Sequence, residues 1–357
     1  MLELPGNLSD RVPFLQDSEP GEVETAQERP FVAIVGAGVA GLAAGRVLQD
    51  QGCLVTLFDK GRRAGGRLAS RDRDGWAFDH GAQYFTARDE RFRSLVDTWL
   101  ELGVVAPWEG RVGTMEKGIL QASPGSTERF VGVPEMNALA AHLAQDLDVR
   151  VGVRVDSVSR VESSWRIATD DGSYGPFDAV IVALPKPQAE ALVGPSVPDA
   201  IMEPCWALML GFDQSLEVEF DGVFVNGDSI SWMARNSSKP ARGARECWVV
   251  HASPAWSKEH LDSEPQEVVV ALLDAFREAM GTLPTPQVAK AHLWRFARGG
   301  MRIQEEAWWD PSTRLAVAGD WLAGGRVEGA WQSGVAAAGF VLGEPETKGR
   351  AVGVGRR

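Results

Sequence analysis

The sequence has few cysteines, few histidines and no long apolar run, and each shortage excludes a class of structure. Its 357 residues include three cysteines, Cys53, Cys205 and Cys247, which form neither a CxxC pair nor a metal-binding spacing. They indicate reduced structural thiols and a cytoplasmic protein. The five histidines contain no HxxxH pattern, so we expect no metal site. No apolar run approaches the roughly 20 residues that a membrane-spanning helix requires, so we expect no membrane contact.

Positive charge is also in the minority. There are 36 lysines and arginines against 49 aspartates and glutamates, a formal charge of -13. This balance disfavours nucleic acid and anionic membranes as partners. It is compatible with a phosphate site, which needs only local cations and backbone amides. Thirteen tryptophans are a high count, and those outside the core can line a site for a flat ligand.

The pattern of apolar segments predicts an α/β fold. Residues 31–35 form a continuous apolar run, as expected of a strand buried on both faces. A helix at 42–49 and a strand at 54–58 complete a βαβ unit. Further strands of the same sheet are predicted at 151–155, 158–168, 178–184 and 315–318. Antiparallel strands are predicted at 205–212, 223–225, 230–234 and 247–251, with a helix at 268–280, which together indicate a second domain inserted into the first.

A dinucleotide fingerprint lies in the first turn of the βαβ unit. Gly36, Gly38 and Gly41 fit GxGxxG: the first permits the tight turn, the second admits a pyrophosphate, and the third lets helix and strand pack closely. The helix amides then face the phosphates with a favourable dipole. Asp59 follows Gly41 by 18 residues, and its carboxylate can accept hydrogen bonds from both hydroxyls of an adenosine ribose.

A second glycine pair and an arginine follow soon after Asp59. Gly65 and Gly66 let another backbone segment approach the ligand, and the forked guanidinium of Arg67 can bridge phosphate oxygens. The run DKxxxxGGR after GxGxxG resembles the flavin amine oxidase superfamily, whose members bind FAD in this way. Four more motifs narrow the resemblance to the bacterial renalase-like NAD/FAD-dependent oxidoreductases, over about residues 31–343: DHGAQYFT (79–86), WVVHASPAWS (248–257), HLWRFA (292–297) and GDWLAGGRVEGAWQSG (319–334).

The resemblance implies a discontinuous Rossmann-type FAD-binding domain with an inserted, amine-oxidase-like substrate domain of mixed β-sheet and helices. The FAD-binding domain is predicted at 30–88, 130–192 and 310–343, and the substrate domain at 89–129 and 193–309. Residues 1–29, which are acidic and lack the pattern of a signal peptide, are predicted to be a disordered arm. Residues 344–357 are predicted to be a flexible tail.

The resemblance also implies FAD contacts near both ends of the chain. A strand that ends at Gly319 and Asp320, and a helix that opens at 327–330, would lie beside the flavin, where free helix amides stabilise the negative charge of its reduced form. Val155 matches a strand whose backbone contacts adenine. The predicted cofactor contacts are Gly36, Gly38, Ala40, Gly41, Asp59, Lys60, Gly66, Arg67, His80, Gly81, Ala82, Gln83, Val155, Gly319, Asp320, Glu328, Gly329 and Ala330. No cysteine adjoins the carboxyl-terminal motif, so we expect non-covalent FAD, with a link through His80 as the alternative.

The substrate implied by the resemblance is a nicotinamide dinucleotide reduced at the wrong ring carbon, 2- or 6-dihydro-NAD(P). Its ring would give a hydride to flavin N5, and O2 would then take the electrons, giving H2O2 and NAD(P)+. The ring aromatises as it loses hydride, so the site needs stacking and dryness but no general base. Amine oxidases of the superfamily commonly carry a lysine on a substrate-domain strand, and the corresponding segment CWALMLGFD has none.

Candidate substrate contacts are aromatic or polar. Tyr84, Trp232 and Trp294 are candidates for the walls, with core packing as the alternative for each tryptophan. Gln83 and His251 are candidates for reading the carboxamide, and a satisfied core histidine is the alternative for His251. The basic segment 235–245, RNSSKPARGAR, is either a contact for substrate phosphates or a solvated loop.

Two other functions fit the same motifs. The first is a flavin amine oxidase or desaturase that acts on a small amine or an apolar substrate. The second is a non-catalytic FAD- or NAD-binding protein, whose flavin no donor would reduce.

Overall fold

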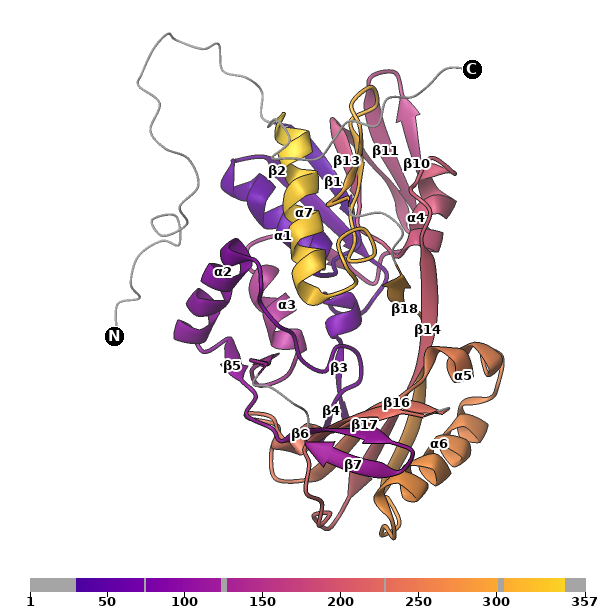
Figure 1. Ribbon diagram of the computed structural model, residues 1–357. Coiled ribbons are helices and arrows are strands. Elements are labelled where there is room, and N and C mark those ends of the chain that lie inside the picture. Colours follow the sequence, from indigo (N-terminus) through magenta and orange to yellow (C-terminus); the bar gives the residue numbers. More distant parts are fainter. Residues whose placement is uncertain (1–29, 74, 123–126, 228, 301–304, 344–357) are drawn as a thin grey trace.

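The computed structural model describes residues 30–73, 75–122, 127–227, 229–300 and 305–343. The predicted arm at 1–29 and the predicted tail at 344–357 lie outside the described residues. Two lobes are joined by a pair of long antiparallel strands, β14 (Ile201–Phe212) and β18 (Val288–Gly300), which run from one lobe into the other (Figure 1).

The upper lobe in Figure 1 is built on a six-stranded sheet of order β19-β20-β13-β1-β2-β9. Its strands are β1 (Phe31–Val35), β2 (Leu54–Asp59), β9 (Asp148–Val151), β13 (Ala179–Val182), β19 (Trp308–Asp310) and β20 (Leu315–Val317). All neighbours pair in parallel except β19 and β20. The α/β fold and the strands predicted at 31–35, 54–58, 178–184 and 315–318 are confirmed.

The strand predicted at 151–155 is wrong. β9 ends at Val151, and Gly152 turns the chain with φ of +75°. A separate antiparallel sheet then begins with β10 (Val155–Val161), followed by β11 (Ser164–Thr169) and β12 (Gly172–Phe177). The hairpin predicted within 158–168 therefore exists but does not belong to the parallel sheet. Glycine supplies the left-handed conformation that ends one strand and redirects the chain.

The lower lobe carries a seven-stranded sheet of order β18-β14-β17-β16-β15-β6-β7. Its other strands are β6 (Val112–Glu116), β7 (Ile119–Ala122), β15 (Gly222–Asn226), β16 (Ile230–Arg235) and β17 (Glu246–Ala252). The predicted antiparallel strands and the helix, α6 (Pro265–Met280), are confirmed. One face of the sheet packs against α6 through Leu208, Val250 and Phe276. Part of the opposite face packs against Trp76 and Phe78 through Met209 and Val249, and the remainder can contribute to a site.

Short elements connect the two sheets. They are α2 (Glu90–Glu101), α3 (Asn137–Leu143), α4 (Lys186–Val193), α5 (Pro254–Glu259), β3 (Ser70–Arg73), β4 (Trp76–Asp79), β5 (Val105–Pro107), β8 (Phe130–Gly132) and the 3-10 turns η2 (Gly66–Leu68) and η3 (Asn236–Ser238). No helix among the described residues is long and apolar enough to cross a membrane.

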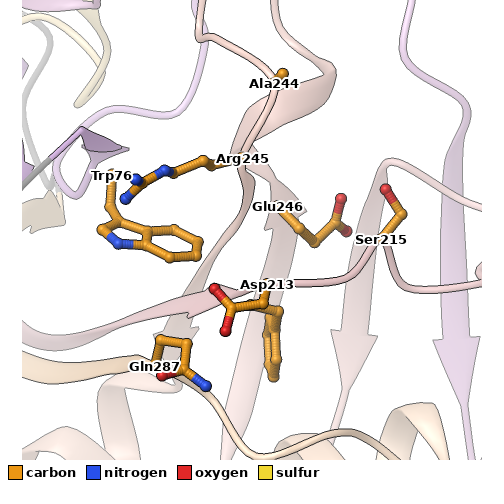
Figure 2. A pocket seen from close by; sticks show the side chains of 8 residues that line it. Trp76, Asp213, Ser215, Ala244, Arg245, Glu246 and Gln287 are labelled. Carbon is orange, nitrogen blue, oxygen red and sulfur yellow. The ribbon is translucent and has the colours of Figure 1, made fainter.

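A small pocket of about 420 Å³ lies at one end of the lower sheet (Figure 2). The guanidinium of Arg245 lies 4.8 Å from the centre of the Trp76 ring, and the pocket is also lined by Asp213 and Glu246. Apart from Ala244 and Arg245, at the end of the basic segment 235–245, none of the predicted site residues lines it, so it is not the candidate site.

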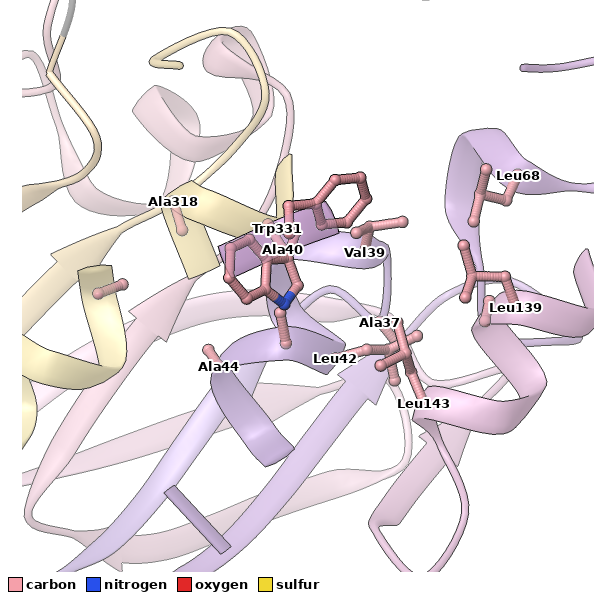
Figure 3. Packing of buried hydrophobic residues seen from close by; sticks show 14 of the residues in the cluster. Ala37, Val39, Ala40, Leu42, Ala44, Leu68, Leu139, Leu143, Ala318 and Trp331 are labelled. Carbon is pink, nitrogen blue, oxygen red and sulfur yellow. The ribbon is translucent and has the colours of Figure 1, made fainter. Parts of the chain in front are cut away.

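The core of the upper lobe has two halves because β1 is buried on both faces. Val32 and Ile34 pack with the helices α1 (Val39–Asp50) and α7 (Val327–Leu342), while Ala33 and Val35 pack with the three-stranded sheet. Small residues bring the two helices together: a Cβ on Gly334 would lie 2.1 Å from the Ala40 carbonyl oxygen. Figure 3 shows Trp331 of α7 against this part of α1.

Candidate active site

A cavity of about 1680 Å³ is lined by both lobes. Small-molecule pockets typically occupy about 300–1,000 Å³, so this cavity has room for an extended ligand or for two ligands together. The upper lobe contributes the turn between β1 and α1 and the end of β2, including Asp59. The lower lobe contributes β16, β17 and β18, including Trp232, His251 and Trp294.

The first glycine motif forms a tight turn with an open side. Gly36 has φ of +105°, and a Cβ on Gly41 would lie only 1.9 Å from the Gly36 carbonyl oxygen. Gly38, in contrast, has no atom within 4 Å of a Cβ position, and it lines the cavity as the N-cap of α1 without a side-chain cap. The helix amides are therefore exposed to the cavity, as in sites that bind phosphate.

The second glycine pair lies directly against the first motif. The Gly65 amide donates to the Ala37 carbonyl oxygen at 2.7 Å, and a Cβ on Gly66 would lie 3.5 Å from the Gly38 Cα. A Cβ on Gly65 would meet Asn137 Oδ1 at 2.1 Å, so α3 requires glycine there. The two motifs form one backbone surface, which explains why a second glycine pair follows the fingerprint.

Two predicted cofactor contacts from opposite ends of the chain form an ion pair. Arg67 Nη2 donates to Asp320 Oδ1 at 2.5 Å, Arg67 Nη1 donates to Asp320 Oδ2 at 3.1 Å, and Nη1 also donates to the Ala297 carbonyl oxygen. Both side chains line the cavity. Because a guanidinium has five N–H donors, Arg67 keeps two for a ligand.

Asp59 fixes the end of β2. Its Oδ2 accepts from the Ala37 amide and its Oδ1 from the Gly61 amide, both at 2.7 Å. Each carboxylate oxygen accepts more than one hydrogen bond. Asp59 therefore retains the acceptor capacity predicted for ribose hydroxyls, and it also holds the glycine turn in place.

Most of the predicted cofactor contacts line the cavity. They are Gly36, Gly38, Ala40, Asp59, Lys60, Gly66, Arg67, Gly81, Ala82, Gln83, Val155, Gly319, Asp320 and Ala330. Gly41, His80, Glu328 and Gly329 do not line it. The buried carboxylate of Glu328 accepts from the amides of Arg88 and Asp89 at 2.6 and 2.7 Å, so it fixes the start of α2. Gly329 lets α7 approach the Ala323 carbonyl oxygen, which a Cβ would meet at 2.0 Å.

The predicted substrate contacts lie on one row of the lower sheet or beside it. In the strand register, Ala207 is opposite His251 on one side and His292 on the other, and His251 is opposite Trp232. Trp232 is in turn opposite Phe224. Residues opposite one another point to the same face of a sheet. His292, His251, Trp232 and Phe224 all line the cavity, so this row forms one of its walls.

Aromatic rings extend that wall. The Trp232 ring centre lies 4.6 Å from that of Phe224 and 5.6 Å from that of Tyr84. The Arg129 guanidinium lies 5.3 Å from the Tyr84 ring centre. Two donors on this wall, Trp232 Nε1 and Arg129 Nε, are buried without a partner in the described part of the chain. Since neither group can accept, both suit a ligand rich in acceptors.

The prediction that Gln83 reads a carboxamide is not supported by its geometry. Its Oε1 accepts from Lys239 Nζ at 3.3 Å, and its Nε2 donates to the Asp79 carbonyl oxygen. The side chain is buried although it borders the cavity. Both polar ends are occupied, so Gln83 stabilises the turn at 79–83.

The basic segment 235–245 was interpreted as either a contact for substrate phosphates or a solvated loop, and both interpretations are wrong for Lys239 and Arg242. Lys239 and Arg242 are buried, not solvated, and neither lines the cavity. Lys239 Nζ and Arg242 Nη2 lie 3.2 and 2.8 Å from Asp79 Oδ2. Burial alone would raise the pKa of Asp79, but these two charges and the hydrogen bonds to the carboxylate lower it to about 2. Burial lowers the pKa of Lys239 to about 8.

Three histidines at the centre of the molecule are neutral. Burial is the main cause that lowers the pKa of His80 to about 3 and the pKa values of His251 and His292 to about 4. The His80 ring stacks on Trp294 with centres 5.2 Å apart, and Trp294 Nε1 donates to the His80 carbonyl oxygen at 2.9 Å. His292 was not predicted as a site residue, although it begins the HLWRFA motif.

The cavity is cationic in a protein of formal charge -13. Three acidic side chains line it, Asp59, Asp156 and Asp320. The basic side chains that line it are Lys60, Arg67, Arg88, Arg129, Arg154, Arg295, Arg298 and Arg326. A concentration of one sign of charge in a cleft favours ligands of the opposite sign.

Known proteins resemble this chain in sequence or in fold. Mouse (Mus musculus) renalase is 22% identical over 299 residues, which cover 75% of this chain and 84% of renalase. Cyclohexylamine oxidase from Brevibacterium oxydans has the same fold, with a TM-score of 0.69, 16% identity and coverage of 88% of this chain and 99% of that one. A triple mutant of putrescine oxidase gives a TM-score of 0.69, 15% identity and coverage of 89% and 99%.

Two family models cover nearly all of the described chain. Residues 34–99 match the NAD(P)-binding Rossmann-like domain, and residues 103–342 match the flavin containing amine oxidoreductases. Together with the glycine motifs at the cavity, these matches bear out the resemblance that the sequence motifs indicated. The chain belongs to the flavin containing amine oxidoreductase family and is an FAD-dependent oxidoreductase.

Proposed function

We propose that the protein is an oxidase that takes a hydride from 2- or 6-dihydro-NAD(P) and passes the electrons to O2. Loss of the hydride leaves NAD(P)+, and the hydride, one proton from solvent and O2 together give H2O2. The charge of the cavity carries this proposal, because eight basic side chains against three acidic ones exceed what one pyrophosphate requires. A substrate with a second pyrophosphate would account for the basic side chains that the FAD pyrophosphate does not require.

The same charge disfavours an amine substrate. A small amine is a cation at neutral pH, and the cavity would repel it. The three central histidines are neutral, which suits a reaction that withdraws a hydride and no proton from the substrate. The unpartnered donors of Trp232 and Arg129 fit an acceptor-rich dinucleotide better than a hydrocarbon.

The cofactor in this proposal is non-covalent FAD, whose N5 would supply the hydride acceptor. Its pyrophosphate would lie on the backbone surface of Gly38 and Gly66, and its adenosine ribose at Asp59. Arg67 and Asp320 would contact it with the donors and acceptors that their ion pair leaves free. His80 does not line the cavity, which supports non-covalent binding over a histidyl link.

The variant Asp59→Ala is expected to bind FAD about 10- to 100-fold more weakly than the wild type. A hydrogen bond to a charged group contributes about 1.5–3 kcal/mol, and the ribose would lose such an acceptor. Flavin fluorescence during titration of the apoprotein with FAD measures the affinity. Asp148→Asn is a matched control, because Asp148 lies on the neighbouring strand β9 and bonds to Thr56 outside the cavity. Equal affinities for Asp59→Ala and wild type would show that adenosine does not bind at Asp59.

Anaerobic reduction of the bound flavin tests the substrate. We expect 2- or 6-dihydro-NAD(P) to reduce it at least about 100-fold faster than ordinary 4-dihydro-NAD(P)H or simple amines. A stacked nicotinamide presents only particular ring carbons to N5, and a misplacement of about 1 Å can cost about 100-fold in rate. Stopped-flow absorbance of the flavin gives the rates. Fast reduction by a primary amine, without a response to the dihydronicotinamide isomers, would instead establish the amine oxidase alternative.

A further inference from the structure

Two histidines on the cavity wall have the same orientation relative to the sheet. His251 on β17 and His292 on β18 are both opposite Ala207 on β14, so they flank it and point to one face. Both side chains line the cavity. Trp232 adjoins His251 in the same row, and the Trp294 ring centre lies 4.6 Å from that of His292.

The contact with Arg71 determines the tautomer of His292. Arg71 Nη2 lies 3.2 Å from His292 Nδ1. A guanidinium only donates, so Nδ1 must accept with its lone pair. In a neutral ring the proton is then on Nε2. No described residue bonds to this Nε2–H, so His292 offers a donor on the cavity wall.

The contact with His80 sets the same Nε2–H tautomer in His251, but here the nitrogen left without a partner is the one with the lone pair. His251 Nε2 lies 3.3 Å from the His80 carbonyl oxygen. A carbonyl only accepts, so Nε2 carries the proton and donates. The lone pair of the neutral ring is then on Nδ1, which no described residue uses. His251 therefore offers an acceptor on the wall to which His292 contributes a donor.

We propose that His251 and His292 together recognise a primary carboxamide on the substrate ring. The carboxamide NH2 donates to His251 Nδ1, and its carbonyl oxygen accepts from His292 Nε2–H. A carboxylate at the same place has no N–H for His251, and its second oxygen would face the lone pair of Nδ1. This inference rests on the proposed function and adds selectivity for the amide form of the dinucleotide over the acid form.

The test compares NAD+ with nicotinic acid adenine dinucleotide as ligands of the oxidised holoenzyme. Changes in flavin absorbance on titration report binding without turnover. We expect NAD+ to bind at least about 10-fold more tightly, because the acid form leaves a polar group of the site unpaired. Equal binding, or tighter binding of the acid form, would overturn the inference, and so would an absence of binding by both ligands.

Variants separate recognition from structural damage. In His251→Phe and His292→Phe, the ratio of the two affinities should fall toward one while FAD stays bound. His260→Phe is the control, because His260 stacks on Trp256 away from the cavity and should leave the ratio unchanged. Rapid flavin reduction by the dihydronicotinamide isomers, together with equal binding of the amide and acid forms, would refute the inference alone. A flavin that no dihydronicotinamide reduces would refute the proposed function, whatever the binding ratio.

Discussion

Replacement of Asp79 by alanine is expected to lower the free energy of unfolding by about 3–5 kcal/mol, the usual cost of removing one partner of a buried ion pair. The Asp79 carboxylate is the partner of both Lys239 and Arg242, and the side chains of all three are almost completely buried. Without it, two cations from the lower lobe would face each other away from water. Chemical denaturation followed by far-ultraviolet circular dichroism measures the loss.

Two further variants make this prediction specific. Asp97→Ala removes an exposed partner of Arg93 within α2 and should cost less than about 1 kcal/mol. Lys239→Met in the Asp79→Ala background removes one of the uncompensated charges and should restore part of the stability. A loss below about 1 kcal/mol in Asp79→Ala would mean that the buried ion pairs contribute little to the stability of the fold.

Acidification from about pH 6.5 to about pH 4 is expected to destabilise the folded protein strongly. His80, His251 and His292 have folded pKa values of about 3 to 4, below the ordinary value of 6.5. Between these values the unfolded chain binds protons that the folded chain does not. Stability is therefore complete above about pH 6.5 and falls as pH falls, by up to about 1.4 kcal/mol per pH unit for each histidine.

Denaturant titrations at several pH values test this window. Asp79 does not contribute within it, because its lowered pKa places its loss of stability below about pH 4. His292→Phe should reduce the pH dependence between pH 6.5 and pH 4. A free energy of unfolding that stays constant from pH 7 to pH 4.5 would show that the three rings are protonated in the folded state.

The elements that could be predicted from the sequence are those in which local pattern and burial agree. The apolar run of β1, the glycine turn and the acidic end of β2 form a unit whose parts lie within 30 residues of one another. The sequence analysis does not predict the strand β18, in which aromatic side chains alternate with arginines. Because one face of this strand lines a cavity, its sequence lacks the alternation of apolar and polar residues that indicates a half-buried strand. The sequence 151–155 looked like a strand because valines surround Gly152.

Cavity-lining residues could be predicted from the sequence where they contact the cavity through their backbone or an aromatic ring. They could not be predicted where a residue distant in the sequence determines the position of the side chain. A basic run is usually solvated, but Asp79, about 160 residues before Lys239 in the chain, draws two of its cations into the interior. Glu328 belongs to the motif that opens α7, yet the amides before α2 use its carboxylate. The role inferred for His292 depends on Arg71 and on the register with Ala207, neither of which its own motif reveals.

The strand order also determines when each lobe can fold during translation. β1 pairs with both β13 and β2, and β13 pairs with β20. β1 emerges early, but its neighbour β13 begins at Ala179, and α7, which covers α1, follows Val327. Every strand of the lower sheet has been translated by Gly300. The lobe that carries the seven-stranded sheet can therefore fold before the lobe that carries the glycine motifs. The cavity, which both lobes line, is therefore completed last, and β1 remains without its neighbour β13 until Ala179 and the residues after it have been translated.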